Sequence, residues 1–256
     1  MSLRNLLLKI QYDGSNYHGY QIQPQAVTVQ KVLEDTLSYI TNEEIHVNGC
    51  SRTDARVHAV EYACSFYTSF PIPAERLPIV LNNKLPEDIR ALSCFEVPQE
   101  FHARFDTVSK TYRYVINTDN NPQVFTRNYE WQIKKKLNTE AMREACKYLI
   151  GENDFTSFMT SGNEVKTAVR NVYNLDIKEN NKNIEIYIRA NGYLYNMVRI
   201  ITGTLVDVGL NKYPPEKLGL ILEAKDRSAA GPTAPPQGLA LYYVEYGRSF
   251  SGKTKS

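Results

Sequence analysis

Hydrophobic and polar positions in the first part of the chain predict the order strand, helix, strand, strand, helix, strand. Leu6–Tyr12 is an apolar run stopped by Asp13-Gly14, which is typical of a strand followed by a turn. After Thr28, a suitable N-cap, apolar residues recur at the one-sided spacing of an amphipathic helix. The remaining predicted elements are a strand over Ile45–Cys50, a strand over Val60–Phe66, a helix over Ala74–Lys84 and a strand over Ile89–Val97.

The strand predicted over Val60–Phe66 has a period of two. Its apolar residues, which begin at Val60, alternate with Glu61, Ala63 and Ser65. Because successive side chains of a strand point to opposite faces, this pattern indicates one buried face and one solvated face.

The second part of the chain predicts a similar set of elements with insertions. Thr111–Ile116 is a strand with two tyrosines on one face and Arg113 on the other. Asn138 caps a helix that Gly151 ends. The other predicted elements are a hairpin of Val172–Lys178 and Ile184–Arg189 joined by Asn180–Asn183, an amphipathic helix over Met197–Val208, a shorter helix from Pro214-Pro215 and a strand over Leu239–Tyr246.

These two series predict an α+β fold of two ferredoxin-like (RRM-like) halves, residues 1–103 and 104–256, with antiparallel sheets and helices on one face. We expect an active-site cleft where the halves meet. A doubly wound nucleotide-binding fold is disfavoured, because the sequence has neither G-x-G-x-x-G after the first strand nor G-x-x-x-x-G-K-[ST]. No nucleotide cofactor is therefore expected.

The composition is that of an ordinary globular protein. Of the 256 residues, 42% are hydrophobic and 23% are charged, which provides for a sizeable core and excludes intrinsic disorder. The net charge is only +2, so a nucleic-acid partner must be met by a local basic surface. No apolar run approaches ~18 residues and the N-terminus lacks a signal-peptide core, so we expect a cytoplasmic protein without a membrane segment.

Cysteines and histidines do not point to a metal or redox centre. Cys50, Cys64, Cys94 and Cys146 contain no C-x-x-C pair, so reduced and mostly buried thiols are expected. The four histidines contain no H-E-x-x-H sequence and no pair at metal spacing, and we expect no metal. No G-x-S-x-G sequence supports a hydrolase triad.

The polar loop Cys50–Ala59 lies between two predicted strands and concentrates two arginines, one aspartate and one histidine. Loops held on rigid strands are where catalytic groups usually sit. A purely structural alternative is an Asx-type turn, in which Asp54 accepts hydrogen bonds from its own loop and Arg52 or Arg56 neutralises it. The spacing of these residues leaves both interpretations open.

Ser51–Ala59 is similar to the motif G-R-T-D-x-G-V-H-A of a known enzyme family. Five further segments match that family's motifs in the same order. They are Phe101–Phe105, Lys110–Tyr114, Gly151–Phe158, Met197–Leu205 and Ala234–Leu239. One such match would be weak, whereas all of them in order are highly specific. By these motifs the chain resembles the tRNA pseudouridine synthase A (TruA-like) family.

What the resemblance implies is an isomerase, a tRNA pseudouridine synthase that converts uridine to pseudouridine in the anticodon stem-loop of tRNA, at nucleotide positions 38–40. It implies no cofactor, no metal, and a homodimer that binds one tRNA across both subunits. Asp54 would be the catalytic carboxylate. Breaking an N-glycosidic bond and forming a C–C bond with the same base needs a nucleophile or a group that assists proton removal, and an aspartate can do either.

The resemblance also implies a pocket for the target base, because a paired or stacked uridine must be extruded before it can react. Tyr112 would pack against the flipped base and Leu239 would form the opposite apolar wall. Arg199 would pair with Asp54 and keep the carboxylate ionised. The structural alternatives are a core strand residue for Tyr112 and for Leu239, and a solvated helical arginine for Arg199.

By the same resemblance, Arg52 would contact RNA phosphate or occupy the space left by the flipped base. Its structural alternative is a surface ion pair with Asp54 or Glu61, worth ~0–1 kcal/mol. We expect His58 to brace the loop rather than act as an acid or base. Three basic stretches could line a phosphate track. They are Lys134–Lys136 with Arg127, Arg104 with Lys110 and Arg113, and the tail with Arg248, Lys253 and Lys255.

Two glycines of the family motif are replaced in this chain, by Ser51 and by Arg56. The second change matters more, because a glycine after the catalytic aspartate usually marks a positive φ or a close approach to a ligand. An L-residue in that conformation costs ~1–2 kcal/mol. Arg56 could reshape the loop, add a phosphate contact or compete with Arg199 for Asp54. The alternative function is therefore a catalytically weakened paralogue that binds or chaperones tRNA.

A third interpretation is an unrelated ferredoxin-like metabolic enzyme. It would need a sequence signature of a small-molecule pocket, and the chain offers none. We therefore expect tRNA as the partner.

Overall fold

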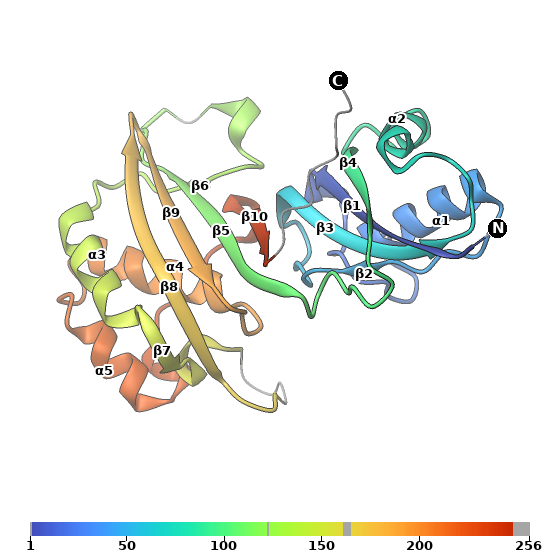
Figure 1. Cartoon of the computed structure of the whole chain (residues 1–256). Coiled ribbons are helices and arrows are strands. Elements are labelled where there is room, and N and C mark those ends of the chain that lie inside the picture. Colours follow the sequence, from blue (N-terminus) through green and yellow to red (C-terminus); the bar gives the residue numbers. More distant parts are fainter. Residues whose placement is uncertain (1, 122, 161–164, 248–256) are drawn as a thin grey trace, which may run out of the picture. The chain divides into compact units, whose positions relative to one another are not determined.

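In the computed structural model, the described residues 2–121, 123–160 and 165–247 form a mixed α/β fold with mostly antiparallel strand pairing (Figure 1). The chain divides into two compact units. Unit 1 comprises the described parts of Met1–Val108 and Leu241–Ser256, and unit 2 is Ser109–Ala240. The sequence-based halves differ from these units mainly at the end of the chain, where the last strand returns to unit 1. Of the basic stretches considered above, the tail with Arg248, Lys253 and Lys255 lies outside the described residues.

The sheet of unit 1 has the strand order β4-β1-β3-β10, and the short strand β2 also pairs with β3. The strands are β1 (Arg4–Tyr12), β2 (Asn48–Gly49), β3 (His58–Thr68), β4 (Ile89–Val97) and β10 (Leu239–Tyr246). Strand β1 is antiparallel to both neighbours, with Leu8 opposite Cys64 on one side and Cys94 on the other. This central position explains why Leu6–Leu8 and Ile10 are all buried, and the predicted strands at β1, β4 and β10 are confirmed.

The alternating pattern predicted for β3 is wrong in the structure. Val60 is 39% exposed, whereas Ala63 and Ser65 are buried. The strand lies inside the sheet, and the Ser65 hydroxyl accepts the backbone N–H of Ala103 at 3.1 Å. Both faces of β3 are therefore covered over Tyr62–Phe66, where a small or polar residue is as well accommodated as a large apolar one.

Two predicted elements of unit 1 are shorter than expected. The strand expected over Ile45–Cys50 is reduced to β2, and the helix expected over Ala74–Lys84 consists of a 3₁₀ turn followed by α2 (Leu77–Asn82). Element ends are where periodicity is least informative, because the last turns depend on tertiary contacts.

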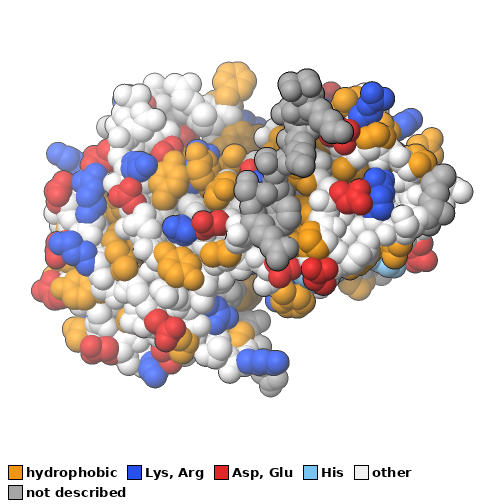
Figure 2. Space-filling model, viewed as in Figure 1, with side chains coloured by type: hydrophobic (Ala, Val, Ile, Leu, Met, Phe, Trp, Pro, Cys, Tyr) orange, Lys and Arg blue, Asp and Glu red, His pale blue; other side chains and the backbone are white. Residues whose placement is uncertain are grey.

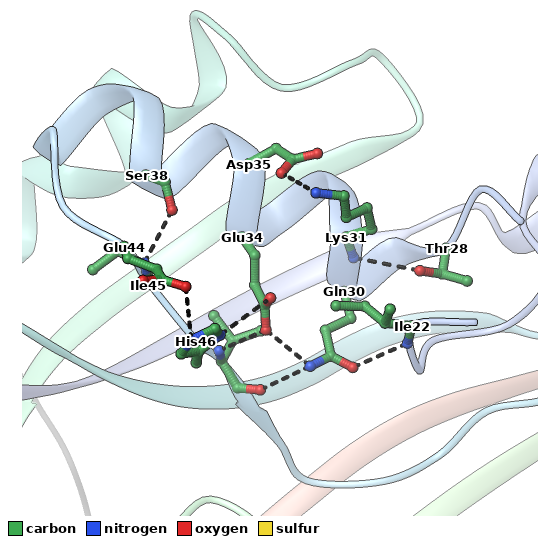
Figure 3. Close-up of polar contacts among 11 residues, drawn as sticks. Ile22, Thr28, Gln30, Lys31, Glu34, Asp35, Ser38, Glu44, Ile45 and His46 are labelled. Carbon is green, nitrogen blue, oxygen red and sulfur yellow. Dashed lines mark hydrogen bonds and ion pairs between the residues drawn. The ribbon is translucent and has the colours of Figure 1, made fainter. Parts of the chain in front are cut away.

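Helix α1 (Val29–Thr41) is confirmed with its predicted cap, because the Thr28 hydroxyl accepts the N–H of Lys31 at 3.4 Å. Figure 3 shows how this helix holds the segment that leads to β2. The half-exposed Ser38 accepts the N–H of Ile45 at 3.0 Å, and the buried carboxylate of Glu34 accepts the N–H of Val47 at 2.9 Å. These bonds position the chain that enters the polar loop after Gly49.

In unit 2 the strands follow the antiparallel order β5-β9-β8-β7, and β6 is parallel to β5. The strands are β5 (Thr107–Asn117), β6 (Trp131–Gln132), β7 (Gly151–Asp154), β8 (Val169–Asn180) and β9 (Asn183–Ala190). The predicted hairpin is confirmed, and Asn181 has the positive φ of 55° that its tight turn needs. Helix α3 (Thr139–Cys146) begins at the predicted Asn138 cap, whose side chain accepts the N–H of Ala141 at 3.1 Å.

Helix α4 (Met197–Gly209) is more deeply buried than its amphipathic pattern predicts. Every residue of this fully described helix is buried except Arg199, which is half-buried. Gly203 lies so close to the carbonyl of Pro232 that a Cβ atom would not fit between them. The shorter helix α5 (Lys217–Ala224) follows the predicted prolines. Helix α4 is thus packed into unit 2 with one arginine at its margin.

Candidate active site

The loop between β2 and β3 holds the motif residues of unit 1, and its backbone is bonded to a second loop of the same unit. The carbonyl of Thr53 accepts the N–H of Tyr20 at 3.1 Å. The Thr53 hydroxyl lies 2.8 Å from the hydroxyl of Tyr12. Farther along, the N–H of Arg56 donates to the carbonyl of Tyr17 at 3.2 Å. The position of Asp54 is therefore determined by bonds on both sides of it.

Asp54 begins a tight turn, in which its carbonyl accepts the N–H of Val57 at 3.2 Å. Arg56, the third residue of this turn, has a φ of 65°, so the positive φ expected from the family's glycine is confirmed. Glycine or asparagine is usual there because the left-handed conformation is unfavourable for other residues, by about 1–2 kcal/mol. The chain keeps this backbone although its residue is an arginine.

Two glycines of the supporting loop make this close packing possible. Gly14 touches the carbonyl of Val57 so closely that a Cβ atom would not fit. Gly19, with a φ of 94°, would place a Cβ atom 2.7 Å from the carbonyl oxygen of Thr53. The sequence analysis did not identify these glycines as part of the site. Their signal in the sequence is the Asp-Gly turn after β1 and a second glycine shortly after it.

His58 braces the two loops, since its Nδ1 accepts the N–H of Gly14 at 3.0 Å and lies 3.1 Å from a carboxylate oxygen of Asp13. It is buried, with 7% of its surface exposed. This position agrees with a supporting role for His58 and keeps the ring away from solvent.

Buried tyrosines form the layer beneath the loop. The rings of Tyr20 and Tyr62 stack with centroids 4.3 Å apart, and the Tyr62 hydroxyl donates to the carbonyl of Ser51. Burial raises the pKa of both tyrosines well above the ordinary value. The support of the loop is thus neutral and shielded from water.

All four cysteines of the chain are also buried, as expected.

The charged side chains of the loop point away from this neutral layer. Arg52 and Arg56 are exposed, and in the described part of the chain neither guanidinium has a hydrogen-bond or ion-pair partner. The expected alternative for Arg52, a surface ion pair with Asp54 or Glu61, is not formed, and Glu61 binds Lys9 at 3.0 Å instead. Asp54, which lies between these two arginines in the sequence, is half-buried.

In unit 2, Tyr112 lies on β5 and is buried, with 5% of its surface exposed. Its ring makes an edge-to-face contact with Tyr193, at 4.9 Å between centroids and 86° between planes. The Tyr193 hydroxyl donates to the carbonyls of Lys110 and Ile188, at 2.7 Å each. These bonds fix Tyr193, and through it the orientation of the Tyr112 ring.

Arg199 is held by fixed acceptors rather than solvated freely. Its Nε donates to the carbonyl of Ala234 at 2.8 Å, and Nη1 donates to the Asn196 side chain at 2.7 Å. Burial raises the pKa of Tyr114, and the nearby charge of Arg199 partly offsets this rise. The expected alternative of a solvated helical arginine therefore does not describe this residue.

The segment before β10 contacts both α4, at Arg199, and β5, at Tyr114. Ala234 bonds to Arg199 at both its N–H and its carbonyl. The next carbonyl, that of Pro235, accepts the Tyr114 hydroxyl at 2.7 Å, and Gly238 lies against the Tyr114 ring. Leu239 follows and is buried, with 5% exposure. The predicted residues thus form two sets, Arg52 and Asp54 in unit 1, and Tyr112, Arg199 and Leu239 in unit 2.

The proposed basic stretches differ in exposure. Lys134–Lys136, Arg127 and Arg104 are exposed, and the Arg104 guanidinium lies 5.8 Å from the centroid of the Phe105 ring. Lys110 is buried and is therefore unsuited to an exposed phosphate track. On the face shown in Figure 2, Lys and Arg side chains are interspersed with Asp and Glu. Phosphate-binding residues must therefore be identified individually.

Within the residues that the structure describes, no cluster of three or more His, Cys, Asp or Glu side chains is suited to hold a metal ion. Among the described helices, none is both long and apolar enough to cross a membrane.

Comparison with known proteins assigns the family. A family model described as tRNA pseudouridine synthase matches residues 9–106 and 145–247, which is most of the chain, and the chain belongs to this family. The matched residues include Arg52, Asp54, Arg199 and Leu239, and Tyr112 lies between the two matched segments.

Curated relatives agree with this assignment over almost the whole chain. The chain is 47% identical over 244 residues to the tRNA pseudouridine synthase A of Clostridium acetobutylicum, with 95% of this chain and 100% of the relative covered. The protein of the same name from a Thermoanaerobacter species gives the same identity and coverage. The tRNA pseudouridine synthase A of Bacillus pumilus is 45% identical over 239 residues, with 93% of this chain and 97% of the relative covered.

Proposed function

We propose that this protein isomerises uridine to pseudouridine in the anticodon stem-loop of tRNA, with Asp54 as the catalytic carboxylate. One observation carries the proposal: the motif aspartate occupies a turn whose backbone is bonded on both sides and supported by two glycines. A catalytic group must be held in a defined geometry, and this loop holds Asp54 through its backbone. Membership of the tRNA pseudouridine synthase family supports the substrate and the reaction.

The reaction requires chemistry that an aspartate can supply. The bond between C1′ and N1 breaks, a bond between C1′ and C5 forms, and a proton leaves C5 while one is gained at N1. No atom is gained or lost and nothing is oxidised. A carboxylate can assist either by attacking as a nucleophile or by helping to remove the proton, and both routes remain compatible with Asp54.

The other site residues receive roles that suit their positions within unit 2. Arg199 is the cation that keeps Asp54 ionised during the reaction, and its guanidinium is already oriented by Ala234 and Asn196. Tyr112 packs against the extruded uracil and Leu239 forms the apolar wall opposite Tyr112. The fixed Tyr112 ring supports this role, because a rigid aromatic surface loses little entropy on stacking.

Within unit 1, Arg52 contacts the RNA backbone beside the extruded nucleotide. Its guanidinium is exposed and has no partner in the described part of the chain, so it needs no rearrangement to meet a phosphate. We further infer that the protein acts as a cytoplasmic homodimer without cofactor or metal, on the strength of the family resemblance.

We interpret both units as ferredoxin-like (RRM-like) halves. In unit 1, the element order β1, α1, β2, β3, α2, β4 with the sheet neighbours β4-β1-β3-β2 supports this interpretation. In unit 2, β5, α3, β8, β9 and α4 follow the same order, and β5-β9-β8 are neighbours.

A second candidate function is a catalytically weakened relative that binds tRNA without modifying it. The positive φ of Arg56 beside the catalytic aspartate favours it, because a strained residue could misplace the carboxylate.

Tritium release from tRNA transcripts labelled at uracil C5 separates the two functions. We expect release by the parent protein and a loss of about 10²–10⁴-fold in Asp54→Asn, with tRNA still bound. Asp35→Asn, a change at an exposed aspartate that pairs with Lys31, serves as the matched control and should leave the rate unchanged. A parent protein that binds tRNA and releases no tritium would establish the second function instead.

A further inference from the structure

Arg56 is the most unusual residue of the loop. It holds the positive-φ position of the turn that begins at Asp54, where the family motif has glycine. Its side chain is exposed, and no partner for its guanidinium exists among the residues that the structure describes. The chain therefore keeps a charged side chain at a position where it is structurally unfavourable and forms no bond within the protein.

The backbone that carries Arg56 is rigid. Its N–H donates to the carbonyl of Tyr17 at 3.2 Å, and Gly14 and Gly19 pack against the neighbouring carbonyls of Val57 and Thr53. The start of the side chain is thus fixed, and only the long flexible part can move. A guanidinium presented in this way offers a fork of N–H donors that matches the oxygens of a phosphate.

The charges around the turn also favour an anion. Arg52 and Arg56 stand two residues before and two residues after Asp54, and both are exposed. Of the acids nearby, Glu61 is paired with Lys9 at 3.0 Å, whereas the Asp13 carboxylate accepts the N–H of Ser15 at 2.9 Å and keeps its charge. Along the loop Cys50–Ala59 two arginines flank one aspartate, so the loop itself carries a surplus of one positive charge.

We propose that Arg56 binds a backbone phosphate of the tRNA next to the extruded uridine, on the opposite side of Asp54 from Arg52. This inference rests on the proposed function and extends it to a binding residue that replaces the family's glycine. Every nucleotide is joined to a phosphate on each side of its sugar, so a carboxylate that approaches the sugar comes near two negative charges, and a cation on each side would offset their repulsion. Backbone strain that is retained beside a reacting group is typical of functional positions.

The salt dependence of tRNA binding tests this proposal. Binding is measured over a range of KCl concentrations in the Asp54→Asn background, so that the RNA stays unreacted. Affinity falls as salt rises, so the slope of log affinity against log salt is negative. One lost phosphate contact should make this slope less steep by about 0.7–0.9 in Arg56→Gln and in Arg56→Gly. Arg56→Lys should keep the slope, because it keeps the charge. The matched control is Arg76→Gln, at an exposed arginine of unit 1 whose guanidinium has no partner in the described residues.

Two results would overturn the proposal. Unchanged slopes in both Arg56→Gln and Arg56→Gly would show that the guanidinium does not meet a phosphate. An unchanged slope together with faster tritium release by Arg56→Gly in the otherwise unaltered protein would show that Arg56 restrains Asp54 instead. The binding measurement needs no turnover, so it still tests the phosphate contact of Arg56 if the proposed isomerisation proves wrong.

Discussion

The loop around Asp54 and the helix around Arg199 position their charged residues by different means. The loop is held by backbone hydrogen bonds and by the close approach of Gly14 and Gly19, and its two arginines, Arg52 and Arg56, remain exposed. Helix α4 is held by burial of all its other residues, and Arg199 emerges at its margin. A loop held through its backbone tolerates changes of side chain, as at Arg56, whereas a buried helix does not.

Of the variants that test this comparison, the largest effect is expected on the rate of tritium release when Arg199 is replaced. Arg199→Ala should reduce tritium release by about 10²–10³-fold, because a preorganised charge is removed from the proposed site. Arg199→Lys should lie between Ala and the parent, since it keeps the charge but cannot bond Ala234 and Asn196 in the same way. Single-turnover assays at a temperature where every variant is folded measure the effect. Parent-like release by Arg199→Ala would remove Arg199 from the catalytic residues.

A smaller effect is expected on stability, when a methyl group is added where Gly203 of α4 meets the segment at Pro232. Gly203→Ala forces a methyl group against the carbonyl of Pro232, and such overpacking should lower the free energy of unfolding by about 1–3 kcal/mol. Urea unfolding measures this change. The control is Gly192→Ala, where the nearest atom to the new Cβ lies at 3.6 Å. Equal stabilities of the two variants would contradict the view that α4 is held by tight burial.

The smallest effect is expected in the loop, at Arg56→Gly. The substitution releases strain of about 1–2 kcal/mol and costs about 0.5–1 kcal/mol through the greater freedom of glycine in the unfolded chain. The free energy of unfolding should therefore rise by about 0–1.5 kcal/mol, as measured by urea unfolding. A clear destabilisation would mean that the Arg56 side chain supports the fold, contrary to its exposed and unpaired state.

Much of the fold follows from local patterns in the sequence. The strands β4 and β10 lie where predicted, and Thr28 and Asn138 cap their helices. These features depend on neighbouring residues, because a cap or a periodic apolar face is determined within one or two turns. The prediction was wrong for β3, whose two covered faces result from neighbours distant in the sequence.

The candidate site shows the same division. Asp54 and the likeness of its loop to a family motif are visible in the sequence, as is the unusual arginine two residues later. The support of that loop by Gly14 and Gly19 is not, because nothing local to either glycine shows which distant carbonyl it will approach. The burial of Lys110 could likewise not be predicted, since alternation cannot tell which face of β5 is covered.

The sequence by itself determined most of the order of helices and strands, though not the short strands β6 and β7, and it determined the family and the chemically distinctive loop, because these follow from short-range patterns of residue type. Only the tertiary structure decided that β3 is covered on both faces and that the last strand returns to unit 1. It also decided that Arg56 is held with a positive φ by bonds to a separate loop. The reason is physical: burial, close packing and backbone pairing join segments far apart in the chain, and their free energy depends on contacts that no local pattern contains.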